Sequence, residues 1–313
     1  MTVSNQCKCG GVTCSVSSEA LTDWGLFALS LLSTVAVFAF NGLAGSGALN
    51  GVGIGDVSDA HSNYIVPDGW AFSIWGAIYS LVALLIVAQF ISLVVPVNAL
   101  PPGGWLRALV GVKKELVVRK VVPLFVASNL CNICWIVFFV LNTTATIAIS
   151  TVLIFSLLAI LVAIYLRTSA WRALHTQRDS LLEVLVIDVL FGMYCGWLTV
   201  ACVVAGAVFF VTIGWNGEPW NGPGWACVML VVAALIEGAN LATRRDPVFA
   251  AVFAWATAAI AMKHASESVA VLIIAALCSG VFGVAAIAVA VAHCVVWCRR
   301  RNGSAVSEGL LGA

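Results

Sequence analysis

The sequence predicts an all-α fold, a polytopic transmembrane bundle of about eight helices. Hydrophobic residues make up 62% of the 313 residues and charged residues only 9%, whereas a soluble domain carries about 25% charged residues. The mean hydropathy is +1.07. The charges are gathered in short clusters between apolar runs long enough to cross a bilayer. The lipid bilayer is therefore the first expected partner, and the sequence gives no sign of nucleic-acid binding or of a sizeable soluble domain.

The N-terminal part divides into a polar tail and a five-helix core. Residues 1–20 are expected to be a cytosolic tail without regular structure, because they are polar and terminal. The core is expected over residues 21–213. Its apolar runs cover residues 24–44, 70–95, 121–141, 145–166 and 181–213.

Turn and helix-breaking residues set the limits of these runs. Pro67 precedes the second run and Pro96 ends it, because proline suits a helix start and is excluded from a helix interior. Only residues 142–144 separate the third and fourth runs, so these two are expected to form an antiparallel hairpin. The fifth run is longer than the hydrocarbon layer is thick, so its helix should tilt or protrude.

Three additional transmembrane helices are expected over residues 214–298. A loop rich in Gly, Pro and Trp at residues 214–224 leads into them, and a basic turn at residues 244–247 separates the first from the second. The chain then ends in a basic cytosolic tail, residues 299–313. The three apolar runs cover residues 225–243, 248–262 and 268–298.

The distribution of basic residues orients the chain. Of the 15 Lys and Arg residues, every one except Lys263 lies in a tail or in the connection after the second, fourth or sixth run. Cytosolic connections are enriched in Lys and Arg. Both termini are therefore expected in the cytosol, while the sequence leaves open which membrane holds the protein.

Aromatic residues gather on one face of the second run. Trp70 falls where a membrane interface favours an indole, and Phe72, Trp75 and Tyr79 follow at helical spacing. Such a ladder can form a wall for a flat apolar ligand, or it can pack against another helix. Spacing by itself favours helix packing.

Two other runs carry polar and aromatic side chains inside the bilayer. Asn132 and Trp135 lie one turn apart in the third run. Tyr194, Trp197 and Ala201 form a stripe in the fifth run. An Asn in lipid is costly unless it is paired, so Asn132 is expected either to line a pocket or to bond another helix.

Three motifs together resemble a known family: Pro67-x-Gly69-Trp70-x-Phe72 with Trp75 and Tyr79, Asn132-x-x-Trp135-x-x-Phe138-Phe139, and Tyr194-x-x-Trp197-x-x-x-Ala201. They are similar to the second, third and fifth helices of the TspO/MBR family, the tryptophan-rich sensory proteins and the mitochondrial translocator protein, or peripheral benzodiazepine receptor. The resemblance covers residues 24–213. The last three helices have no counterpart in five-helix members, so the chain looks like a longer, eight-span branch.

The resemblance implies a bundle that binds porphyrins, sterols and aromatic drugs in an intramembrane pocket, with no agreed enzymatic activity. We therefore expect the protein to bind, sense or transport a small planar hydrophobic ligand, with porphyrin or haem as ligand and no required cofactor. A homodimer is left open. The expected ligand-binding residues are Trp70, Phe72, Trp75, Tyr79, Asn132, Trp135, Tyr194, Trp197 and Ala201.

Acidic residues inside the apolar runs suggest an alternative function. Asp188 lies in the fifth run and Glu237 in the sixth, and an intramembrane carboxylate often marks an ion or proton site. The alternative is an ion- or proton-coupled small-molecule transporter that uses both. Otherwise both pair with nearby basic or polar groups. Glu183 is expected to be solvated, because it lies near the cytosolic end of its run.

The sequence shows no catalytic constellation and no metal site in the apolar runs. The four His residues are scattered, without a nucleophile nearby in sequence. We therefore expect no enzymatic activity. Cys7, Cys9 and Cys14 in the tail form a weak candidate for metal binding. Cys294 and Cys298, at the end of the last run, are candidates for reversible palmitoylation.

The charge asymmetry generates a test of topology. A single Cys introduced at Gly217, on a background without other Cys, should react with a membrane-impermeant maleimide from the outer side. The reason is that residue 217 lies in a connection without Lys or Arg. Labelling from the cytosolic side alone would contradict this orientation.

Overall fold

The computed structural model describes residues 5–9, 12–16, 18–61, 63–101, 104–174, 180–215, 217 and 219–311, with side chains only from Ser18 to Val296 and without those of Arg172 and Ala173. Seven helices in these ranges are long and apolar enough to cross a membrane. An eighth apolar helix is 17 residues long, at the short end of the range for a span. The predicted polytopic helical bundle is confirmed.

The chain folds into two compact units. Unit 1 contains residues 1–62 and 73–214, and unit 2 contains residues 63–72 and 215–313. The sequence placed a domain boundary after residue 213, within one residue of the end of unit 1. It did not predict that residues 63–72, which lie inside the expected core, belong to the second unit.

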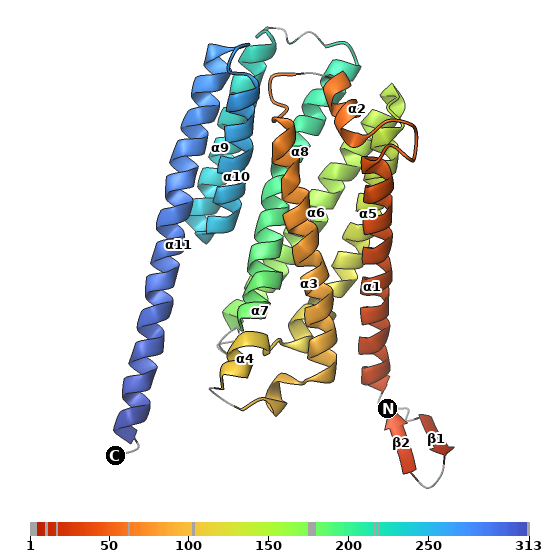
Figure 1. The fold of residues 1–313 in the computed structure, drawn as a ribbon, viewed down its shortest axis with the longest axis vertical. Coiled ribbons are helices and arrows are strands. Elements are labelled where there is room, and N and C mark those ends of the chain that lie inside the picture. Colours follow the sequence, from red (N-terminus) through yellow and green to blue (C-terminus); the bar gives the residue numbers. More distant parts are fainter. Residues whose placement is uncertain are drawn as a thin grey trace. The chain divides into compact units, whose positions relative to one another are not determined.

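Unit 1 consists of a short hairpin and a helical bundle (Figure 1). Strands β1 (Asn5–Cys9) and β2 (Val12–Val16) pair antiparallel. The helices are α1 (Ser18–Gly45), α2 (Ile54–Ala60), α3 (Ile74–Val94), α4 (Trp105–Val110), α5 (Val122–Val140), α6 (Thr144–Leu174), α7 (Leu181–Val184) and α8 (Leu190–Thr212). A 3₁₀ turn, η2 (Val97–Ala99), follows α3, and the π-helical turns η3 (Glu115–Lys120) and η4 (Leu185–Val189) precede α5 and α8.

The N-terminal tail differs from its prediction. It was expected to lack regular structure, but its backbone forms the β1–β2 hairpin, in which Cys7 lies opposite Cys14. The two strands have five residues each, with the sequences NQCKC and VTCSV, and successive side chains in them point to opposite faces. The side chains of Cys7, Cys9 and Cys14 lie outside those that the structure describes. Helix α1 begins at Ser18, so the last residues of the predicted tail are helical.

The predicted hairpin of the third and fourth runs is found as α5 and α6. Asn142 in its turn has φ 51, a left-handed conformation that Asn tolerates better than most residues. Thr143 and Thr146 bond each other's backbone amides and so cap the start of α6. Helix α5 packs against both α1 and α6, and α6 packs against α8. Fully buried side chains between these helices include Phe125, Ile136, Leu157 and Phe191.

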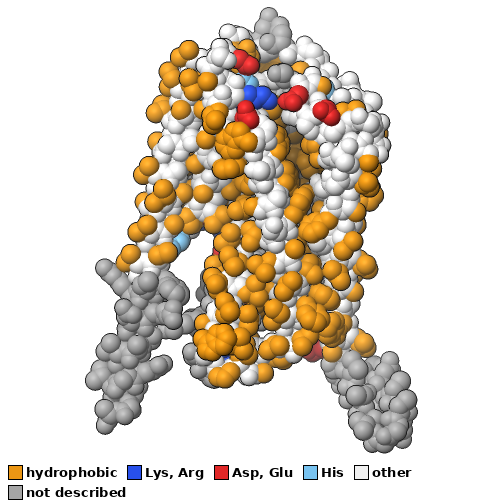
Figure 2. Space-filling view, in the orientation of Figure 1, with side chains coloured by type: hydrophobic (Ala, Val, Ile, Leu, Met, Phe, Trp, Pro, Cys, Tyr) orange, Lys and Arg blue, Asp and Glu red, His pale blue; other side chains and the backbone are white. Residues whose placement is uncertain are grey.

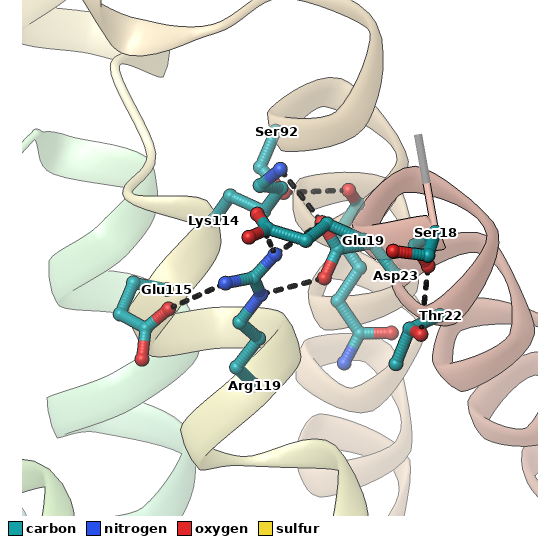
Figure 3. Close-up of polar contacts among 9 residues, drawn as sticks. Ser18, Glu19, Thr22, Asp23, Ser92, Lys114, Glu115 and Arg119 are labelled. Carbon is teal, nitrogen blue, oxygen red and sulfur yellow. Dashed lines mark hydrogen bonds and ion pairs between the residues drawn. The ribbon is translucent and has the colours of Figure 1, made fainter. Parts of the chain in front are cut away.

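A charged cluster joins the start of α1 to η3 (Figure 3). The Asp23 carboxylate is buried and accepts hydrogen bonds from Arg119 Nε at 2.7 Å and Arg119 Nη2 at 3.1 Å. Lys114 Nζ lies 2.7 Å from the same carboxylate. Glu19 and Glu115 contact the outer side of the guanidinium. The hydrogen bond to Asp23, then that to Glu19, raises the pKa of Arg119, so this cation remains charged at any physiological pH.

A second ion pair, buried on both sides, joins the α4–η3 connection to α7. Lys113 Nζ lies 2.8 Å from Glu183 Oε1, and the Lys113 backbone N–H donates to Glu183 Oε2 at 2.9 Å. Glu183 is 0% exposed. The expectation of a solvated Glu183 was therefore wrong, because residues 111–114 fold over it. Ser180 caps α7 by accepting from the Glu183 amide, and Lys113 also lies over the Trp171 ring.

Unit 2 consists of three helices, α9 (Gly222–Arg244), α10 (Pro247–Lys263) and α11 (Val269–Leu311). Helix α11 packs against both α10 and α9 (Figure 1). Asp246 caps α10 by accepting from the amides of Val248 and Phe249. Helix α11 continues to Leu311, so the predicted basic tail is mostly an extension of the last helix. No Pro after Pro247 is present to end it.

Residues 63–72, which we call the strap, belong to unit 2. The last four residues of the strap belong to the 3₁₀ turn η1 (Gly69–Ser73). The Asp68 amide donates to Ala259 O at 3.3 Å, and His264 Nε2 lies 3.1 Å from Val66 O. The Tyr64 ring lies so close to Gly222 that an added Cβ would meet it at 3.1 Å. The extra helices thus hold the chain segment that leads into α3.

The molecular surface fits a membrane environment. On the face that Figure 2 shows, hydrophobic side chains lie along the helices and charged side chains are few. Many large apolar side chains are exposed along the helices, among them Leu32, Val152, Leu235 and Val284. Contiguous exposed apolar surface of this kind is normal in lipid and rare in water.

The buried Lys113–Glu183 pair generates a prediction of stability. Lys113→Met should lower the free energy of unfolding by about 3–5 kcal/mol, because it leaves a buried carboxylate without its cation. The double variant Lys113→Met/Glu183→Met should recover much of this loss. Glu115→Gln, at an exposed ion pair, should cost only about 0–1 kcal/mol. Unfolding by SDS titration in mixed micelles measures all three. An equal loss in Lys113→Met and Glu115→Gln would contradict the assignment.

Candidate functional site

Trp75 is the centre of an aromatic cluster in unit 1. Tyr79 from α3 and Trp135 from α5 stack on it, at centroid distances of 5.4 and 6.1 Å. Tyr194 and Trp197 from α8 meet the Trp75 ring edge to face, at 5.8 and 6.4 Å. The three helices that sequence motifs singled out therefore do converge on one place.

Three of these rings, together with Phe139, form a ladder of stacked rings. Tyr79, Trp75, Trp135 and Phe139 follow one another with interplanar angles of 28°, 27° and 29°. Trp135 is buried, as are Tyr194 and Trp197, whereas Trp75 and Tyr79 are half-buried. The ladder thus runs from a partly accessible edge to a buried interior. Phe38 of α1 adds a tilted ring to Tyr79 at 5.3 Å.

A polar centre lies beside the rings. Asn132 is fully buried, and its Nδ2 donates to Tyr194 Oη at 3.3 Å. Its Oδ1 accepts from Asn41 Nδ2 of α1 at 2.8 Å. Both alternatives considered for Asn132 are relevant here, since the residue bonds two other helices and also lies next to the aromatic cluster. Asn41 was missed in the sequence analysis, although a lone Asn in an apolar run was the available signal.

The polar contacts continue for one further turn between α1 and α5. Asn129 Nδ2 donates to Ser33 Oγ at 3.0 Å, and Thr34 Oγ1 lies 3.4 Å away. Nearer the aromatic rings, the Tyr79 hydroxyl is buried and has no hydrogen-bond partner among the described residues. A ligand with a polar group at this position would satisfy it.

Trp70 and Phe72 are placed apart from the other predicted site residues. Both belong to the strap in unit 2, where the Trp70 ring packs edge to face on Trp255 at 4.5 Å. Trp255 Nε1 in turn donates to Ala71 O at 3.1 Å. Trp70 therefore anchors the strap on α10, while α3 carries Trp75 and Tyr79 into unit 1. Ala201, on α8, is half-buried.

The two acidic residues of the alternative function lie in different units. Asp188 of η4 is exposed in unit 1, and Glu237 of α9 is buried in unit 2, at 1% exposure. The described residues contain no group of three or more His, Cys, Asp and Glu side chains that could hold a metal ion. The Trp75 cluster itself offers stacked aromatic rings and the amide hydrogen bonds of Asn132.

Comparison with known proteins identifies the family. A family described as TSPO-like protein matches residues 27–289. The chain belongs to this family, which confirms the resemblance drawn from the motifs. The match also runs past the five-helix core into α11, so the extra helices are part of the family pattern. No curated protein and no solved structure matches the chain.

The polar centre generates a prediction about the bundle. Asn132→Val should lower the free energy of unfolding by about 1–2 kcal/mol, because it removes the bonds to α1 and α8 and leaves Asn41 and Tyr194 unpaired. Leu130→Ala on the exposed face of the same helix should change it by only about 0.5 kcal/mol. SDS unfolding titrations measure both. A neutral Asn132→Val would show that the network contributes nothing to helix association.

Proposed function

We propose that this TSPO-like membrane protein binds, senses or transports a small planar hydrophobic ligand, such as a porphyrin, haem or a sterol, at the Trp75 cluster. The single observation that supports the proposal most is the ladder of stacked rings from α3 and α5. A flat ligand can extend such a ladder at ring contact distance, about 3.5–4 Å. The ligand is bound rather than converted, and the protein requires no cofactor.

The accessible edge of the ladder is where the ligand enters. Trp75 and Tyr79 are half-buried, whereas the rings behind them are buried. The Tyr79 hydroxyl can bond a polar group of the ligand, and Tyr194, with Asn132, forms a fixed polar wall. Aromatic walls with a few placed polar groups are typical of small-molecule sites.

The proposal includes an orientation with both termini in the cytosol, supported by the asymmetry of basic residues. The alternative function, an ion- or proton-coupled transporter, is favoured by one observation, the buried Glu237. Asp188 supports it less, because an exposed side chain is not enclosed in a site within its own unit.

Two variants test the ligand site. Ala201→Phe fills space on α8, one turn from Trp197, and should weaken protoporphyrin binding at least tenfold, about 1.4 kcal/mol. Trp135→Ala should do the same, because it interrupts the ladder. Quenching of tryptophan fluorescence by protoporphyrin measures the affinity, and size-exclusion chromatography checks folding.

Phe155→Ala is the matched control, because Phe155 is an exposed aromatic residue of α6 outside the ladder. Its affinity should equal that of the wild type. If Ala201→Phe and Trp135→Ala both fold and bind like the wild type, the rings serve only in helix packing and the proposal is wrong.

A further inference from the structure

Glu237 is a buried carboxylate without a basic partner among the described residues. It lies in α9, two turns before the helix ends, and is 1% exposed. Neither of its carboxylate oxygens has a hydrogen bond among the described residues. Asn240 lies one turn further on, and its buried Nδ2 also lacks a hydrogen bond there. Two polar side chains on one helix face thus remain unsatisfied in a membrane-spanning segment.

The helices packed on α9 offer Glu237 no cation. Helix α10 has no ionisable residue between Pro247 and Met262. Helix α11 has only Cys278 before His293. Within α9 the other ionisable residues are Cys227, near its start, and Arg244, exposed at its end.

Among the side chains that the structure describes, the other charges of unit 2 are Asp68 in the strap and those at the two ends of α10. Asp246 caps the start of α10, and its negative charge disfavours the ionised form of Glu237. Arg245, beside Asp246, is exposed. At the other end, His264 is 2.6 Å from Glu267 and is therefore engaged elsewhere, and Lys263 lies next to it in the chain. No ion pair joins Glu237 to a basic residue within the part of the chain that the structure describes.

An ionised carboxylate in this position costs several kcal/mol, because it is removed from water without a counter-charge. A neutral carboxylic acid avoids that cost. We propose that Glu237 is a proton-binding site of unit 2, which carries its proton at neutral pH and loses it only when water or a cation reaches α9. Asn240 is a positioning residue, whose amide can donate to the carboxylate once it is ionised.

This site is distinct from the Trp75 cluster and goes beyond the ligand-binding proposal. It assigns proton binding to the three additional helices. A proton bound or released here changes the number of charges within the membrane part of α9 to α11 by one, so the packing of these helices would respond to proton activity.

Infrared spectroscopy of the full-length protein in lipid tests the proposal. The wild type at neutral pH should show a protonated carboxylic C=O band that is lost in Glu237→Gln and absent after titration to high pH. Asp188→Asn is the matched control, because Asp188 is an exposed carboxylate of another apolar run, and it should keep the band. A neutral-pH spectrum without such a band, or a band that persists in Glu237→Gln, would overturn the assignment.

Carbodiimide labelling provides an independent readout. Dicyclohexylcarbodiimide enters apolar regions and reacts with a protonated carboxyl, whose oxygen adds to the carbodiimide carbon while the proton moves to nitrogen. Mass spectrometry should find the adduct on Glu237, decreasing as pH rises. Protection by sodium ions at fixed pH would show a cation site instead and overturn the proton assignment. Glu237→Gln should bind protoporphyrin like the wild type, so failure here is distinguishable from failure of the ligand site.

Discussion

A buried Asn, Asp or Glu side chain inside a bilayer is costly unless another protein group bonds it, because lipid offers no partner. This constraint determines how unit 1 is held together. Asn132 of α5 bonds α1 and α8 through Asn41 and Tyr194. Asp23 of α1 holds η3 through Arg119 and Lys114, and Glu183 holds the segment before η3. Hydrophobic packing brings the helices together but does not distinguish one rotation of an apolar helix from another, whereas these bonds do.

The aromatic cluster depends on that fixed arrangement. Trp75 can stack on Trp135 only if α3 and α5 are held at one rotation, and the Asn132 bonds set the rotation of α5 against α1 and α8. The edge-to-face contacts of Tyr194 and Trp197 with Trp75 depend in the same way on the rotation of α8. They are favourable because ring quadrupoles prefer that geometry. Polar bonding and aromatic stacking therefore specify the same site.

The strap belongs to unit 2 although it precedes α3 in the chain. Residues 63–72 are bonded by unit 2, through Ala259, Trp255 and His264, and continue directly into α3. Within unit 2, the strap is therefore held by α10 and by the residue that follows it. The family match likewise includes the strap and continues to residue 289 in α11.

The sequence by itself determined the class of protein, the helices and the family. Apolar runs separated by charged clusters are sufficient for this. A bilayer requires each spanning helix to have a certain length and to satisfy its backbone hydrogen bonds internally. The three aromatic motifs also indicated which helices would meet. Only the tertiary structure decided the partners of individual side chains. Trp70 packs on Trp255 rather than on the ladder, and the buried Glu183 pairs with Lys113. Glu237 has no cation beside it among the described residues. Spacing along one helix shows which residues share a face, but the neighbour of that face depends on how all the other helices pack.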